Sequence, residues 1–189
     1  KVVKTSSANT TGTERIFEAA STTKLPTDAT IVNLQGDEPL MPPSAINQVA
    51  GAVTSGEVPM ATLKELIVDR KDIFDPNLVK VVTDQNDIAL YFSRAPIPWS
   101  RQGFATDNIE PGEGDAWYRH LGLYAYKHSL LARYVSWPPG KLEQLESLEQ
   151  LRVLENGERI KVLTATESIP AGIDVPSDVT RTLKYLKDN

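Results

Sequence analysis

The sequence has 189 residues, of which 40% are hydrophobic and 24% charged, as expected for one globular domain with a substantial core. Its net charge of −5 argues against a nucleic-acid-binding surface, so a phosphorylated substrate would need local neutralisation by a metal or by clustered Arg and Lys. The lack of cysteine excludes disulfides and thiolate metal sites, and no apolar run is long enough to span a membrane. We therefore expect a soluble, cytoplasmic domain.

Strands and helices alternate along the first half of the chain. Thr11 and Glu14 form a Thr-x-x-Glu capping box, which predicts a helix from residue 11 onward. The other expected elements are the end of a strand at Val2-Val3, a strand over 29–34, a helix from about Ser44 and a strand over 59–63.

The second half begins with two apolar runs around a polar turn, which predict a β-hairpin. A long exposed loop, rich in Gly, Asp and Asn, separates this hairpin from the remaining elements. The expected elements are the hairpin strands 79–82 and 88–92, the loop 100–116, a strand over 121–126, a helix over 141–156, a strand over 160–166 and a helix over 176–186.

This order predicts an α/β fold, with a mostly parallel sheet, flanking helices and an antiparallel β-hairpin insertion. Because the chain opens on a helix almost at once, we expect earlier strands of the sheet to be missing from it.

Two carboxylates lie at the ends of core elements. Asp37 follows the strand at 29–34 in Gln35-Gly36-Asp37-Glu38-Pro39, where an α/β sheet commonly binds ligands, and it can hold Mg²⁺ against phosphate oxygens. Asp174 precedes the last helix and can share that cation. The alternatives are a solvated loop with Asp37 as a helix cap and, with equal weight, an N-cap-like role for Asp174.

Arg94 follows the strand at 88–92, in a segment that Pro96 and Pro98 stiffen. A guanidinium held in this way suits a carboxylate or phosphate group of a substrate. The alternative is an ordinary surface arginine at a strand end.

Residues 120–126 alternate along a predicted strand. His120, Gly122, Tyr124 and Tyr126 share one face, which can form the floor of a site for a polyhydroxylated ligand. A half-buried sheet face with satisfied hydroxyls explains the same pattern at least as well.

The helix predicted over 141–156 carries polar residues inside its apolar sector. Placed at about 100° per residue, Glu149 and Arg152 fall among the leucines, including Leu145, whereas Glu143 falls outside. Glu149 therefore either pairs with Arg152 or recognises hydroxyls of a sugar.

Four of these motifs occur in one order: Val32 to Pro39, Tyr91 to Pro98, His120 to Tyr126 and Leu148 to Arg152. Together with Gly172-Ile173-Asp174 they closely resemble the 3-deoxy-manno-octulosonate cytidylyltransferase family, from about Thr11 to the C-terminus. The resemblance implies a Rossmann-like nucleotidyltransferase fold. It also implies transfer of CMP from CTP to the acidic sugar 3-deoxy-manno-octulosonate, with release of pyrophosphate, in lipopolysaccharide biosynthesis.

The resemblance also assigns roles to residues. It implies that Asp37 and Asp174 are catalytic and hold Mg²⁺, and that Thr13 and Arg15 lie near the nucleotide. It further implies a homodimer and an acceptor-sugar and dimerisation subregion over 79–126. The residues implied to bind the sugar are Gln35, Arg94, His120, Tyr124, Glu149 and Gln150.

One departure from the family affects the expected activity. Family members begin with a strand and a loop containing Arg and Leu-Pro-Gly-Lys that grips the triphosphate, and this segment is not in the sequence. We therefore expect an N-terminally incomplete domain that has negligible transferase activity as an isolated chain. Two alternatives remain: a CMP-sialate synthetase-like enzyme, and a non-catalytic fragment for acceptor binding or dimerisation.

Overall fold

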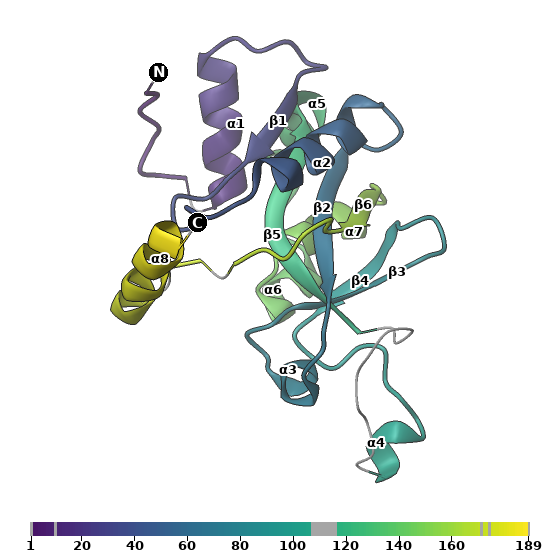
Figure 1. Cartoon of the computed structure of the whole chain (residues 1–189). Helices are drawn as coiled ribbons and strands as arrows, with labels where there is room; N and C mark the ends of the chain where they lie inside the picture. The colour runs from purple at the N-terminus through teal and green to yellow at the C-terminus, as the bar shows by residue number, and fades with distance from the viewer. Residues whose placement is uncertain (1, 10, 107–116, 171, 174, 189) are drawn as a thin grey trace.

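A central sheet with helices on both faces forms the body of the computed structural model (Figure 1). The structure describes residues 2–9, 11–106, 117–170, 172–173 and 175–188. The strands are β1 (Thr30–Asn33), β2 (Met60–Leu66), β3 (Lys80–Thr83), β4 (Ala89–Ser93), β5 (Tyr118–Lys127) and β6 (Ile160–Thr164). The helices are α1 (Gly12–Thr22), α2 (Pro43–Thr54), α3 (Arg70–Phe74), α4 (Gly103–Thr106), α5 (His128–Tyr134), α6 (Lys141–Glu146), α7 (Gln150–Glu155) and α8 (Pro176–Asp188).

The strand order is β4-β3-β5-β2-β6, with β1 also paired to β5. Strands β1, β2, β3 and β6 run in one direction, and β4 and β5 run in the other. The expected α/β class, flanking helices and β3–β4 hairpin are confirmed. The sheet is nevertheless mixed: within the described part of the chain, β2–β6 is the one parallel pairing, because β5 lies antiparallel between strands that share a direction.

The two faces of the sheet bury separate apolar clusters. On one face, β5 packs Leu121, Leu123 and Ala125 against α2. On the other face, residues of α5 and α7 such as Leu130 and Leu151 cover the sheet. This split follows from the period-2 alternation of strand side chains, and it leaves the polar alternate residues of β5 on the α5–α7 side.

A local sequence signal explains where α1 begins. The capping box of α1 is confirmed: Thr11 accepts a hydrogen bond from the Glu14 backbone N–H, and Glu14 accepts one from that of Thr11. Other elements differ from the expectations. Residues 2–3 are not in a strand, and α5 was not predicted, because it follows β5 directly at Lys127 with no side-chain cap.

No helix in the described ranges is both long and apolar enough to cross a lipid bilayer.

Candidate active site

A cavity of about 480 Å³ lies beside the centre of β5. Strand β2 pairs with one edge of β5 along most of its length, whereas β1 and β3 pair with opposite ends of the other edge. Among the described strands, none pairs with the part of that edge around Gly122, which lines the cavity. Its polar lining comes mainly from Thr13, Asn33, Gln35, His120, Tyr124, Tyr126, Tyr134, Ser147, Glu149 and Gln150.

Strand β5 forms the floor of this cavity. His120, Gly122, Tyr124 and Tyr126 all line it, as their alternation predicts, and the rings of Tyr124 and Tyr126 stack with centroids 5.8 Å apart. The expected alternation of this strand face is confirmed, and its role toward a ligand stays a prediction.

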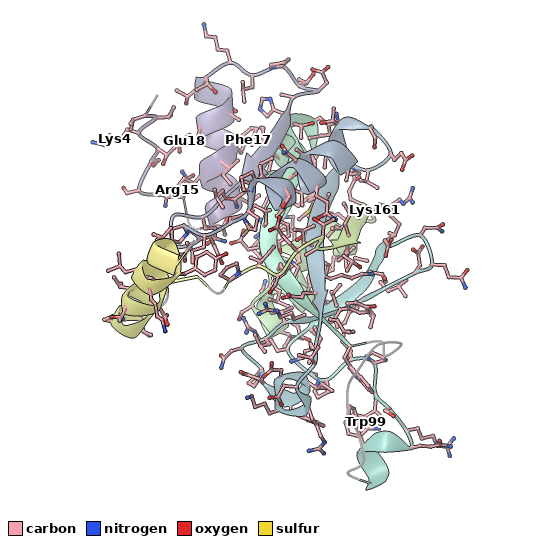
Figure 2. The ribbon with its side chains drawn as sticks, viewed as in Figure 1. Lys4, Arg15, Phe17, Glu18, Trp99 and Lys161 are labelled. Carbon is pink, nitrogen blue, oxygen red and sulfur yellow. The ribbon has the colours of Figure 1, made fainter. Side chains whose placement is uncertain are left out.

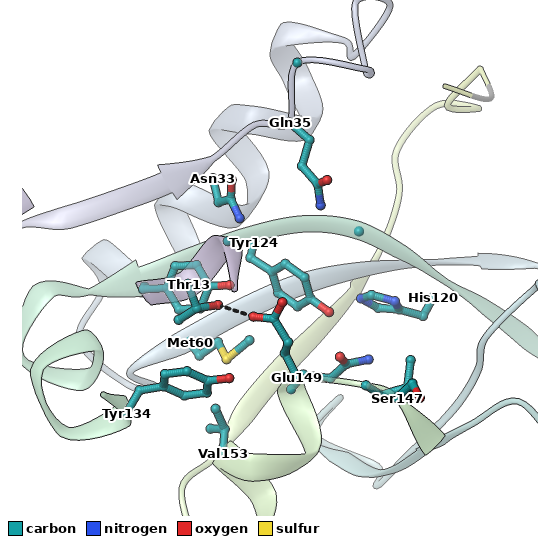
Figure 3. Close-up of a pocket in the computed structure, with 16 residues that line it drawn as sticks. Thr13, Asn33, Gln35, Met60, His120, Tyr124, Tyr134, Ser147, Glu149 and Val153 are labelled. Carbon is teal, nitrogen blue, oxygen red and sulfur yellow. Dashed lines mark hydrogen bonds between the residues drawn. The ribbon is translucent and has the colours of Figure 1, made fainter. Parts of the chain in front are cut away.

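The opposite wall is the turn between α6 and α7. Ser147 adopts a left-handed conformation, with φ of 54°, and ends α6. The chain then places Glu149 at the start of α7, where its carboxylate accepts a hydrogen bond of 2.8 Å from the Thr13 hydroxyl. Gln35, Tyr124 and Glu149 point into the same space (Figure 3).

This turn corrects the expectation of one continuous helix over 141–156. Arg152 donates to both oxygens of Glu143, at 2.7 and 2.6 Å, and does not pair with Glu149. Leu145, expected in the apolar sector, is 83% exposed, whereas Glu143 is buried. The break at Ser147 rotates α6 relative to α7, so angles counted along a straight helix misplace these side chains.

Two residues that line the cavity each have one buried polar atom with no hydrogen-bond partner among the described residues. They are the hydroxyl oxygen of Tyr134 and the amide nitrogen Nε2 of Gln150. An unpaired buried polar group costs about 1–3 kcal/mol, and both atoms are closed to solvent in this structure.

The cavity keeps its titratable rings neutral. Burial raises the pKa values of Tyr124, Tyr126 and Tyr134, and the carboxylate of Glu149 raises them further. Burial also lowers the pKa of His120 to about 3. The phenols are therefore hydrogen-bond donors near neutral pH, and His120 is an uncharged imidazole.

The structure brings together six of the residues predicted for the site. Gln35, Thr13, His120, Tyr124, Glu149 and Gln150 all line the cavity. Their individual roles toward a substrate stay predictions.

Two predicted arginines are not part of the cavity lining. Arg94 donates from Nε to the Glu146 carbonyl oxygen at 2.7 Å and from Nη1 to that of Pro76 at 2.9 Å. Arg15 donates to the Thr5 hydroxyl at 3.2 Å and lies beside the N-terminal segment that carries Lys4 (Figure 2). In this structure Arg94 joins the end of α6 to the loop before β3, and its substrate role stays a prediction.

The predicted metal ligands are described only in part, because Asp174 lies outside the described residues. Ile173 donates a backbone hydrogen bond of 2.8 Å to the carbonyl oxygen of Asp37. A Cβ atom added to Gly172 would lie 2.9 Å from that oxygen, so the chain at 172–173 packs closely on the loop after β1. Within the described residues, no three His, Asp or Glu side chains form a group that could hold a metal ion.

Sequence reasoning missed several cavity residues, above all Tyr134, Asn33, Met60 and Ser147. Asn33 ends β1, so the strand-end argument used for Asp37 could have found it. Tyr134 belongs to the unpredicted helix α5, and no local signal pointed to it.

Comparison with known proteins identifies the family. Residues 1–160 match the family model described as cytidylyltransferase. A 3-deoxy-manno-octulosonate cytidylyltransferase from Stenotrophomonas maltophilia is 48% identical over 181 residues, which cover 96% of this chain and 70% of that relative. The chain belongs to the 3-deoxy-manno-octulosonate cytidylyltransferase family.

Other similar proteins agree with this assignment. A family member from Alcanivorax borkumensis is 49% identical over 95% of this chain and 72% of its own length. A solved structure of CMP:2-keto-3-deoxy-manno-octonic acid synthetase complexed with CTP matches with a TM-score of 0.83 and 31% identity, over 96% of this chain and 70% of that one. The fold of this cytidylyltransferase is therefore that of a nucleotidyltransferase, as the sequence predicted.

Proposed function

We propose that this protein transfers CMP from CTP to 3-deoxy-manno-octulosonate, with release of pyrophosphate, in the cytoplasmic part of lipopolysaccharide biosynthesis. Family membership supports the reaction. The observation that carries the assignment of the sugar to the cavity is its polar lining, in which Gln35, Tyr124 and Glu149 point into the same space. Sugar hydroxyls can pair with these groups, and an apolar ligand cannot.

The remaining cavity groups suit a polyhydroxylated sugar. Glu149 carries acceptor oxygens for sugar hydroxyls, and Thr13 orients its carboxylate. Tyr124 supplies a donor, and Gln35 supplies both a donor and an acceptor. Arg94 is the proposed partner of the sugar carboxylate, since a guanidinium has five N–H donors and two are used by backbone carbonyls here.

The reaction follows from holding the sugar in this orientation. The oxygen of its anomeric hydroxyl attacks the α-phosphorus of CTP and forms a new P–O bond. The bond from that phosphorus to the oxygen bridging to the β-phosphate breaks, pyrophosphate leaves, and the hydroxyl proton is released. The protein contributes by fixing the attacking oxygen and excluding alternative hydroxyls, which is an effect of proximity and orientation.

We further propose that Asp37 and Asp174 hold a divalent cation, Mg²⁺, beside the triphosphate. Two carboxylates are the protein ligands that Mg²⁺ commonly takes, and the close packing of Gly172 and Ile173 on the Asp37 loop supports their proximity. When bound, the cation would offset the negative charge of the phosphates. Thr13 and Arg15 are proposed on the nucleotide side, and the assembly is proposed to be a homodimer.

The sugar assignment is tested by calorimetry with 3-deoxy-manno-octulosonate and, separately, with sialic acid. We expect the protein to bind the first and not the second, because the acceptors differ in their carbon skeleton and substituents. Tighter binding of sialic acid would replace the proposal by that of a CMP-sialate synthetase-like enzyme.

The role of Asp37 is tested with Asp37→Asn. In a polypeptide that also carries the N-terminal triphosphate-binding segment of the family, we expect loss of CTP-dependent CMP transfer, with unchanged binding of the sugar. Asp28→Asn, a change on an exposed loop before β1, is the matched control and should retain transfer. Near-normal turnover by Asp37→Asn would contradict the metal assignment.

A further inference from the structure

Thr62 lies beneath the cavity floor, where β2 and β5 lose their regular register. Thr62 pairs with Tyr124, and the next residue, Leu63, pairs with Leu121, so Gly122 and Leu123 have no partner on β2. This irregularity is a β-bulge, and such bulges commonly redirect a side chain beside a site. The Thr62 side chain is fully buried at this bulge.

The Thr62 hydroxyl oxygen has three close polar neighbours. It lies 2.9 Å from the carbonyl oxygen of Leu121, 2.8 Å from that of Leu123, and 3.0 Å from Nε2 of His120. Carbonyl oxygens can only accept hydrogen bonds. The Thr62 hydroxyl therefore donates its single proton to one of these two carbonyl oxygens or shares it between both. A lone pair of the hydroxyl oxygen then faces Nε2 of His120. These two atoms form a hydrogen bond only if Nε2 carries a proton and donates it.

The surroundings of His120 leave it one ring proton. The imidazole packs between Phe92 and Tyr124, with ring centroids 5.1 and 5.2 Å away. Burial lowers its pKa to about 3, so the ring is neutral near pH 7. If Nε2 holds the proton, Nδ1 carries a lone pair, and Nδ1 makes no hydrogen bond within the described residues.

We propose that Thr62 is a positioning residue that holds His120 in its Nε2–H tautomer, so that Nδ1 accepts a hydrogen bond from a hydroxyl of the cavity ligand. The opposite tautomer would present an N–H donor at this place, and the cavity already has donors in Tyr124 and Gln35. Only the identity of the ligand rests on the proposed function. The tautomer itself is a property of the free protein.

The two histidines of the sequence make this tautomer directly measurable by NMR of ¹⁵N-histidine-labelled protein. Nδ1 of His128 lies 3.1 Å from the carbonyl oxygens of both Leu25 and Pro26, so His128 should carry its proton on Nδ1. We expect His120 to show the opposite pattern, with Nε2 protonated and Nδ1 bare. A wild-type His120 that is charged or protonated on Nδ1 at neutral pH would overturn the proposal.

Two substitutions distinguish a positioning role of the Thr62 hydroxyl from a packing role of the Thr62 side chain. Thr62→Val keeps the β-branched shape and removes the hydroxyl, and we expect it to populate the Nδ1–H tautomer of His120 while His128 is unchanged. Thr62→Ser keeps the hydroxyl and should retain the wild-type pattern. An unchanged His120 pattern in Thr62→Val would contradict the proposal. If Thr62→Val does not fold, the wild-type and Thr62→Ser spectra decide by themselves.

Calorimetry with 3-deoxy-manno-octulosonate gives the functional readout. Thr62→Val should raise its Kd about fivefold, which converts to about 1 kcal/mol, whereas Thr62→Ser should stay within about twofold of wild type. The matched control is Thr54→Val, an exposed site at the end of α2. Equal affinities in wild type and Thr62→Val would refute the inference. A wild-type protein that binds no sugar but shows the expected tautomers would refute the proposed function instead.

Discussion

The floor and the α6–α7 wall of the cavity are built in different ways. The floor is one strand, β5, whose alternating residues present a polar face over its length. The wall depends on a break at Ser147 and on an ion pair between Glu143 and Arg152. A regular element places its side chains by period alone, whereas an irregular turn needs tertiary contacts to place Glu149.

Breaking the buried ion pair of the wall should have the largest effect. Glu143→Gln leaves the Arg152 guanidinium buried beside Tyr134 without its carboxylate, and we expect a loss of about 3 kcal/mol in the free energy of unfolding. Urea denaturation measures this loss. Glu158→Gln, which removes the partner of exposed Arg133, should cost at most about 1 kcal/mol. Equal losses in both variants would mean that the pair does not stabilise the wall.

Substitution of Glu149 should change the affinity for the ligand more than the stability of the fold. Glu149→Gln exchanges a carboxylate that accepts from Thr13 and faces the cavity for a neutral amide. We expect about a 30-fold weaker binding of the sugar, about 2 kcal/mol, because hydrogen bonds to charged groups are the strong ones. Calorimetry measures this change. Unchanged affinity would show that the wall only encloses the ligand.

The floor should make stability depend on pH through His120. Its folded pKa of about 3 lies below the ordinary value of 6.5, so between these values the unfolded chain binds a proton that the folded chain does not. Stability should therefore fall as the pH drops below 6.5. From pH 7 to 4.5 we expect wild type to lose about 1 to 2 kcal/mol more than His120→Gln, allowing for solvent in the cavity. If the free energy of unfolding falls equally with pH in wild type and His120→Gln, a neutral buried His120 is contradicted.

Tyr134 should give the smallest effect. Tyr134→Phe removes only the unpartnered hydroxyl and keeps the ring on Arg152. We expect stability to be unchanged or slightly higher, and sugar binding within about twofold of wild type, because the buried hydroxyl is closed to solvent. Thermal denaturation and calorimetry measure the two quantities. Clearly weaker sugar binding would show that the hydroxyl turns toward the sugar in the complex.

Local pattern predicted most of the fold and much of the candidate site. The capping box at Thr11 gave the start of α1, and the alternation from His120 to Tyr126 gave the cavity floor. The sheet pairing was not predicted, because the neighbour of a strand is set by how segments far apart in the chain fold together, although the alternation along β5 is typical of an antiparallel strand. Helix α5 was not predicted because it follows β5 directly, without a side-chain cap or a turn residue to mark its start.

The sequence by itself determined which residue types face the cavity from β5, because strand geometry turns every second side chain to one face. It also determined the family, through motifs kept in order along the chain. Only the tertiary structure decided the partner of each buried charge. The left-handed Ser147 ends α6, Arg152 of α7 pairs with Glu143 of α6, and Glu149 accepts a hydrogen bond from Thr13 at the cavity.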